Sequence, residues 1–168
     1  MRTASIVTVM AATAVALAQQ ASQPQAPPPE KTFASAAEVQ AMLANAKTAR
    51  KSDQANFTQT MLNLAPYRVA MEYRVQGLDS PPTIHEKDAE MIYVIEGAGT
   101  LTVGGKLVNE KRSGPTGLQG TGIEGGTPRR IAKGDYIIVP EKTAHSFTKT
   151  EGTLVIMSVH VPRGVSAQ

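Results

Sequence analysis

The sequence contains no cysteine and no tryptophan, and its charges are nearly balanced. The absence of cysteine excludes disulfides, cysteine-ligated zinc, iron–sulfur clusters and thiol nucleophiles. A net charge of +3, scattered along the chain, gives no reason to expect a nucleic acid as partner. Any metal or acid–base chemistry must therefore rest on three histidines, the carboxylates and the hydroxyls.

The length of 168 residues is enough for one ordinary domain with extensions, and too short for two large domains. Hydrophobic residues make up 41% of the chain and charged residues 18%, which is typical of a globular protein. The 14 glycines and 11 prolines indicate many turns, so the composition favours β structure.

The N-terminal segment has the pattern of a signal peptide. Arg2 is followed by an uncharged, largely apolar run over residues 6–18, which ends in Ala16-Leu17-Ala18, a sequence that signal peptidase can cut. The run is shorter than the ~20 apolar residues that cross a membrane. An uncleaved anchor and a buried helix are the alternatives. We expect residues 1–18 to be removed and the protein to be exported, to the periplasm or outside the cell, with no stable membrane insertion afterwards.

A proline-rich linker and a helix come next. Residues 19–31 contain four prolines and little to bury, so we expect an extended linker followed by a single folded domain over residues 32–168. Ser35 and Glu38 match a capping box, which predicts a helix over residues 35–50. Its apolar stripe should pack against the body of the domain; the stripe consists of Val39, Met42, Leu43 and Ala46.

From Phe57 onward the hydrophobic period changes to two. In residues 68–75 the apolar positions fall on one face, and further short apolar runs follow between turn residues, as in a sandwich or small barrel. Residues 100–103 and 106–108 flank Gly104-Gly105 and form a hairpin candidate. Residues 109–126 contain six glycines and no apolar period, which predicts a long loop where substrate specificity would reside.

Two histidines and one carboxylate could form a metal site. His85 lies just after a Pro-Pro break, Glu90 begins an apolar strand, and His145 lies 55 residues after Glu90. Taken singly, each has a structural explanation as a surface or hydrogen-bonded residue. Brought together on adjacent strands, they would form a two-histidine, one-carboxylate set that suits Fe, Mn, Ni, Co or Zn and leaves positions open for water or substrate.

The spacing of these residues resembles the two sequence motifs of the cupin superfamily. The first motif, G-x5-H-x-H-x3–4-E-x6-G, is similar to the segment from Gly77 to Gly97. The second, G-x5-P-x-G-x2-H-x3-N, is similar to the segment from Gly134 to Lys149. The resemblance covers roughly residues 66–162. It implies an all-β cupin jelly-roll barrel, or double-stranded β-helix, with one N-terminal helix and a metal inside one mouth of the barrel.

Three positions depart from the motifs. Thr83 stands where the first motif has its leading histidine, Lys142 where the second has glycine, and Lys149 where it has asparagine. The resemblance then leaves His85, Glu90 and His145 as ligands of a divalent transition metal, with Thr83 lining the pocket or contacting metal-held water. In the alternative, the site has lost its metal and His145 is a polar core residue.

Strand parity extends the pocket, because alternate residues share a face. Thr83 should accompany His85, Phe147 should accompany His145, and Ile92 and Val94 should accompany Glu90. The result is a mostly apolar pocket with a few polar groups, the usual form of a small-molecule site. His160 is expected to face outward, and the alternative is an acid–base residue near the mouth of the barrel. Two basic pairs, Lys111-Arg112 and Arg129-Arg130, are interpreted as solvated surface charges.

Two functions from different classes follow from this pattern. The first is a metal-dependent enzyme acting on a small organic molecule by dioxygenase, isomerase or lyase chemistry. The second is a non-catalytic exported cupin that binds a small ligand such as a sugar, with the metal structural or absent. A homodimer is compatible with either function.

Overall fold

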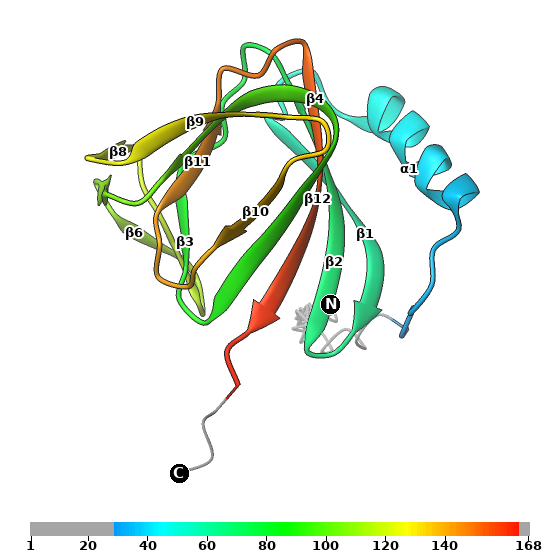
Figure 1. The fold of residues 1–168 in the computed structure, drawn as a ribbon, viewed down its shortest axis with the longest axis horizontal. Helices are drawn as coiled ribbons and strands as arrows, with labels where there is room; N and C mark the ends of the chain where they lie inside the picture. Colours follow the sequence, from blue (N-terminus) through cyan, green and yellow to red (C-terminus); the bar gives the residue numbers. More distant parts are fainter. Residues whose placement is uncertain (1–28, 165–168) are drawn as a thin grey trace, which may run out of the picture.

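The computed structural model describes residues 29–164, and the predicted signal peptide at residues 1–18 lies outside that range. The described residues form one helix and twelve strands (Figure 1). In chain order these are α1 (Ala36–Ala49), β1 (Asn56–Leu64), β2 (Tyr67–Val75), β3 (Thr83–His85), β4 (Asp88–Val103), β5 (Lys106–Val108), β6 (Lys111–Gly114), β7 (Gly117–Gln119), β8 (Gly122–Glu124), β9 (Thr127–Ala132), β10 (Tyr136–Val139), β11 (His145–Thr148) and β12 (Thr153–Pro162). Within residues 29–164, no helix has the length and apolar character that a membrane crossing requires.

Ten of the strands form one strongly curled antiparallel sheet, and β5 and β8 form a separate two-stranded sheet, which confirms the all-β prediction. Its order is β1-β2-β12-β4-β11-β3-β7-β6, and β9 and β10 also pair with β4. The first part of β4 pairs with β12 and β10, whereas its last residues pair with β9 and β11. The long β4 therefore carries the chain from one wall of the half-barrel to the other, as Figure 1 shows.

Gly97 lies where β4 changes partners. Its φ angle is 81°, in the left-handed region, and a Cβ atom there would lie 1.8 Å from the backbone oxygen of Thr153. Any side chain at this position would push β12 away from β4. The glycine that closes the first motif is thus required by the bend between the two walls.

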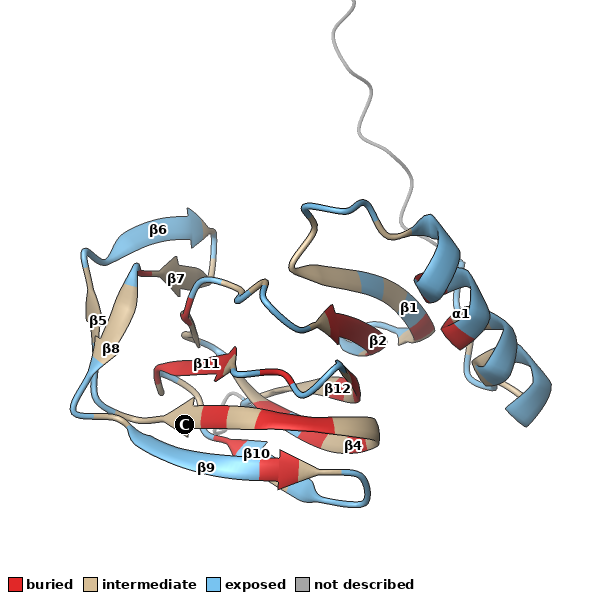
Figure 2. Cartoon of the chain, turned by 90° about the horizontal axis from the view of Figure 1, so that it is seen from above, coloured by how far each residue is buried: buried red, intermediate tan, exposed pale blue. Residues whose placement is uncertain are grey.

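Helix α1 forms where the sequence predicts it. Ser35 Oγ accepts a hydrogen bond from the backbone N–H of Glu38, and Glu38 accepts one from the N–H of Ser35, so the capping box is present. Leu43 and Ala46 are buried against β1 and β2, and Val39 and Met42 pack beside them. Figure 2 shows the outer face of the helix exposed, so the helix covers the outside of the β1–β2 hairpin.

Strand β2 has two different faces. Val69, Met71, Tyr73 and Val75 point to the helix and complete the outer apolar cluster, as the alternation predicts. The other face carries Arg68, Ala70, Glu72 and Arg74 and points into the half-barrel, where these four residues line a cavity. A second apolar cluster fills the rest of the interior, and it consists of Ile92, Val94, Leu101, Ile131, Val139, Phe147, Leu154 and Ile156.

Two predictions about the glycine-rich region are wrong. Residues 109–126 are not a long loop, because they contain β6, β7 and β8. Strand β5 does not pair with the end of β4 as a hairpin; it pairs with β8. Gly120 serves close packing, since a Cβ there would lie 2.7 Å from the oxygen of Val108. Strands of three or four residues are too short to show a hydrophobic period.

Candidate metal centre

Strand pairing brings the three predicted ligands together. His145 at the start of β11 pairs directly with Thr83 on β3, and His85 lies two residues further along the same face of β3. Glu90 lies near the start of β4, opposite His160 of β12. The consecutive strands β3 and β4 and the distant strand β11 thus each contribute one side chain to the same site.

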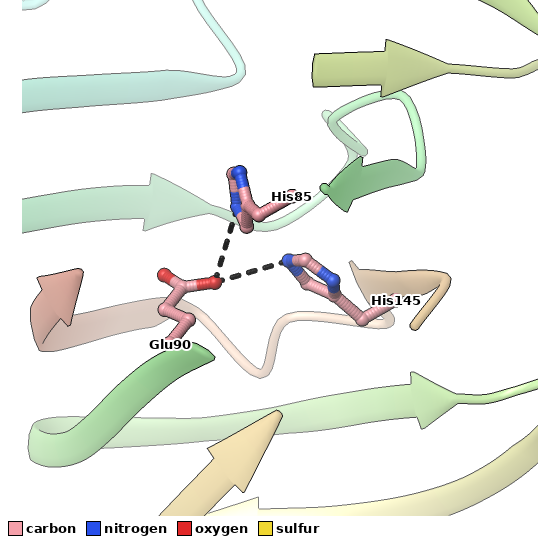
Figure 3. A group of neighbouring side chains, drawn as sticks. All are labelled: His85, Glu90 and His145. Carbon is pink, nitrogen blue, oxygen red and sulfur yellow. Dashed lines mark ion pairs between the residues drawn. The ribbon is translucent and has the colours of Figure 1, made fainter. Parts of the chain in front are cut away.

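The ligand atoms converge on one point. Figure 3 shows the carboxylate of Glu90 between the two imidazoles. Oε2 of Glu90 lies 3.1 Å from Nε2 of His145 and 3.5 Å from Nε2 of His85. All three donor atoms lie within 4.8 Å of one another, which is close enough for a single cation to contact them together.

The surroundings of the donor atoms fit a metal. Nδ1 of His145 lies 3.2 Å from the backbone oxygen of Thr143. A carbonyl oxygen only accepts hydrogen bonds, so Nδ1 carries a proton and donates it to Thr143, while Nε2 faces the site. Oε2 of Glu90 is buried and accepts no hydrogen bond from the described residues. A cation placed between this buried carboxylate oxygen and the two imidazole nitrogens that face it would stabilise it.

The charge state of Glu90 also suits a ligand. Burial acts to raise the pKa of Glu90, but the imidazoles of His145 and His85 outweigh burial and hold that pKa well below its ordinary value. The carboxylate therefore stays ionised at any ordinary pH, and the ionised form is the one that binds a metal.

The three positions that depart from the motifs have the following surroundings and backbone conformations. Thr83 takes the place of an imidazole, and its Oγ1 lies 3.3 Å from Nε2 of His145. Lys142 and Lys149 adopt φ angles of 59° and 48°, the left-handed conformation that glycine and asparagine take most easily. Both turns of the second motif thus persist with a less suitable residue.

The three donors line a cavity of about 450 Å³ that opens between β2, β3 and β12. Of the predicted pocket residues, Thr83 and Phe147 line this cavity. Ile92 and Val94 do not, because they are buried in the apolar cluster of the barrel interior. Strand parity gives the face of a strand but not the depth along it, and these two residues lie deeper than Glu90.

His160 also lines the cavity, so the prediction that it faces outward is wrong. Its ring centroid lies 4.5 Å from that of His85, edge to face. Burial lowers the pKa of His160, which keeps its imidazole neutral at pH 7. The register that pairs His160 with Glu90 across β12 and β4 places it there, and no sequence pattern gives that register.

Sequence reasoning missed a buried polar group in the same cavity. Glu72 and Arg74 are 8% and 5% exposed and form an ion pair of 2.7 Å between Oε2 and Nη2. Ser158 and Asn56 donate hydrogen bonds of 2.7 Å to Glu72. The sequence does show that β2 has a polar face opposite its apolar face. Such a polar face is normally interpreted as exposed to solvent, unless it is known that the rest of the barrel closes over it.

The predicted surface charges are indeed on the surface. Arg112 pairs with Glu86, and Arg130 pairs with Glu151 at 2.8 Å. Neither arginine lines the cavity. From the glycine-rich region, Gln119 of β7 contributes to the cavity wall.

No protein-family model and no curated protein matches the sequence. Among solved structures, KdgF from Halomonas sp. is similar, with 16% identity over 68% of this chain and 87% of its own, at a TM-score of 0.50. The Schizosaccharomyces pombe Cnp3 cupin domain has 13% identity over 66% of both chains, at a TM-score of 0.50. An uncharacterized protein with a double-stranded β-helix domain from Klebsiella pneumoniae has 15% identity over 70% of this chain and 85% of its own, at a TM-score of 0.51.

Identities this low establish the fold alone. The likeness agrees with the curled antiparallel half-barrel and with the motif resemblance over most of the folded residues. The described part of this chain therefore has the fold of the cupins, a double-stranded β-helix, with one helix packed on its outside.

Proposed function

We propose that this protein is a divalent-metal-dependent enzyme that acts on a small organic molecule inside the barrel. The observation that carries the proposal is the convergence of His85, Glu90 and His145 within 4.8 Å, on the wall of a cavity of about 450 Å³. The buried, unpartnered Oε2 of Glu90 supports a cation at this point more strongly than a purely structural role.

The donor set defines which metals suit the site. Two imidazoles and one carboxylate fit Fe, Mn, Ni, Co or Zn, and three ligands leave coordination positions for water and substrate. When bound, such an ion would act as a Lewis acid on an oxygen of the substrate. This set fits dioxygenase, isomerase and lyase chemistry alike.

The side chains of the cavity have separate roles in this proposal. Glu90 and His145 are each 3% exposed within the packed wall, so they hold the ligand geometry fixed. The half-buried His85 lies at the open side, where substrate enters. His160, neutral at pH 7, is placed beside His85 to take up a proton from the substrate.

Metal content tests the proposal. The protein is purified after growth with added Mn, Fe, Ni or Zn, beside His85→Ala and Glu90→Ala variants, and its metals are measured by mass spectrometry. Glu86→Gln is the matched control, because it neutralises the neighbouring carboxylate that pairs with Arg112 outside the cavity. We expect about one ion per chain in the wild type and the control, and close to none in the two ligand variants. Equal metal content in all four proteins would contradict a metal held by His85 and Glu90. It would favour the alternative, a non-catalytic binding protein without a metal in this cavity.

We also propose that the protein is exported. The pattern of Arg2, the apolar run and Ala16-Leu17-Ala18 supports this. The intact mass of the secreted protein should lack residues 1–18, and retention of Met1 through Ala18 would contradict the proposal. The homodimer stays a prediction that light scattering can test.

A further inference from the structure

Arg74 is a buried cation with unused hydrogen-bond donors. It is 5% exposed, and it lies on the face of β2 that lines the cavity. One of its terminal nitrogens, Nη2, binds Glu72. Its other two nitrogens, Nε and Nη1, are buried and have no hydrogen-bond partner among the described residues. Buried donors without acceptors are rare, because each loses its water without compensation.

Glu72 contacts only Nη2 of Arg74 and leaves Nε and Nη1 without an acceptor. Oε1 accepts a hydrogen bond from Ser158, and Oε2 accepts from both Asn56 and Arg74. These contacts come from three strands, β1, β2 and β12, so they fix the carboxylate firmly. Glu72 therefore orients the guanidinium and leaves its remaining N–H groups available to a ligand.

The guanidinium lies close to the candidate metal centre. Its central carbon lies 4.2 Å from the centre of the Phe147 ring, a stacking contact that fixes the plane of the group. Phe147 and the metal-ligand candidate His145 are neighbours on β11, and their ring centres are 6.4 Å apart. Arg74 and the three donors line the same cavity, so a ligand in it lies near both.

The buried charges of the cavity, which do not include the exposed Arg68 of its lining, favour a ligand with one negative charge. The charge of Arg74 is balanced by Glu72, and Glu90 adds one negative charge. A divalent cation at the centre would leave the buried wall with one net positive charge. A carboxylate supplies one negative charge and two acceptor oxygens in a plane, which suits guanidinium donors. A phosphate dianion would bring an excess of negative charge beside Glu72 and Glu90.

We propose that Arg74 is a substrate-binding residue and that the substrate is a small carboxylate, whose carboxylate group accepts hydrogen bonds from Nε or Nη1. This identification of the substrate class rests on the proposed function. The binding of a carboxylate to Arg74 can be measured separately from the metal, so the two ideas can fail independently.

Pyruvate, its uncharged counterpart pyruvamide and inorganic phosphate are the probes. Each is titrated into ¹⁵N-labelled protein loaded with Zn, and the Nε–H signal of Arg74 is followed by NMR. The signal is assigned by its absence in Arg74→Lys, a variant that keeps the charge beside Glu72 but loses Nε and Nη1. We expect pyruvate to shift the signal, and Arg74→Lys to bind pyruvate at least tenfold more weakly with unchanged metal content.

A second variant separates a loss of pyruvate binding from a loss of folding. Glu72→Gln/Arg74→Met removes the ion pair as a unit, which leaves no unpaired charge, and it should fold, keep its metal and lose pyruvate binding. Equal affinity for pyruvate and pyruvamide, tighter binding of phosphate, or unchanged pyruvate affinity in Arg74→Lys would each overturn the inference. Loss of the metal from the wild type with retained pyruvate binding would instead contradict the proposed function alone.

Discussion

The buried ion pair of β2 gives a sharp stability prediction. In Glu72→Gln, the side chain keeps its shape and one acceptor oxygen, but it loses its charge. The new amide nitrogen takes the place either of Oε2, beside the donors Nη2 of Arg74 and Nδ2 of Asn56, or of Oε1, beside the Ser158 hydroxyl, which can accept its hydrogen bond. Arg74, at 5% exposed, then remains as a buried cation without a counterion.

The size of the loss follows from the burial of the pair. Removing one partner of a buried ion pair costs roughly 3–5 kcal/mol of folding free energy. The pair borders a cavity that water can enter, so we expect about 3 kcal/mol, at the low end of that range. For a domain of this size that corresponds to a fall in the melting temperature of about 10 °C. Because single domains are stable by roughly 5–15 kcal/mol, the variant should still fold.

Urea and thermal unfolding, followed by circular dichroism, measure this change. Glu151→Gln is the matched control, since it removes a carboxylate that pairs with Arg130 on the surface, and its effect should be much smaller. Adding Arg74→Met to Glu72→Gln should recover most of the lost stability, because no charge is then left unpaired. A Glu72→Gln protein as stable as the control would refute the view that this pair is buried and coupled.

Three further predictions follow from the same structure. Burial acts to raise the pKa of Glu72, but Arg74 and the hydrogen bonds to the carboxylate outweigh burial and hold that pKa below 4.5. The stabilisation from Glu72 is thus fully present above pH 4.5 and is lost as the pH falls through the pKa of Glu72 in the folded protein. The free energy of unfolding of Glu72→Gln should therefore depend less on pH on the acid side than that of the wild type. An equally steep dependence in both proteins would contradict this. Gly97→Ala should lower the free energy of unfolding in urea far more than Gly77→Ala. Both glycines have left-handed φ angles, but only Gly97 lies against the backbone of Thr153. Equal losses of stability in the two variants would contradict the packing argument. Lys142→Gly should stabilise the protein by up to about 1 kcal/mol in the same assay. The strain of a side chain in the left-handed region, ~1–2 kcal/mol, is larger than the ~0.4–1 kcal/mol by which glycine stabilises the unfolded chain through its added entropy. A loss of stability in Lys142→Gly would refute this estimate.

Short-range signals in the sequence were sufficient for parts of the fold. The capping box of Ser35 and Glu38 located α1, and the alternation in β2 identified its helix-facing side. Motif spacing grouped His85, Glu90 and His145, which the structure places within 4.8 Å of one another. These features depend on residues close in sequence or on spacings inherited with a known fold.

What the sequence could not reveal depends on register and depth. His160 faces the cavity because β12 pairs with β4 in a register that sets it opposite Glu90. Ile92 lies on the same face of β4 as Glu90, yet it is covered by the interior cluster. Glu72 and Arg74 look like solvent-facing residues of an amphipathic strand until the barrel closes over them. Each of these facts is set by tertiary contacts between distant strands.

The central claim, that His85, Glu90 and His145 hold a divalent metal, is tested most directly by anomalous diffraction. Crystals of the protein grown with Zn or Mn would be measured on both sides of the metal absorption edge. The account predicts one strong anomalous peak in contact with Nε2 of both histidines and with Oε2 of Glu90, and its absence in Glu90→Ala. A wild-type crystal with no peak there, at saturating metal, would contradict it.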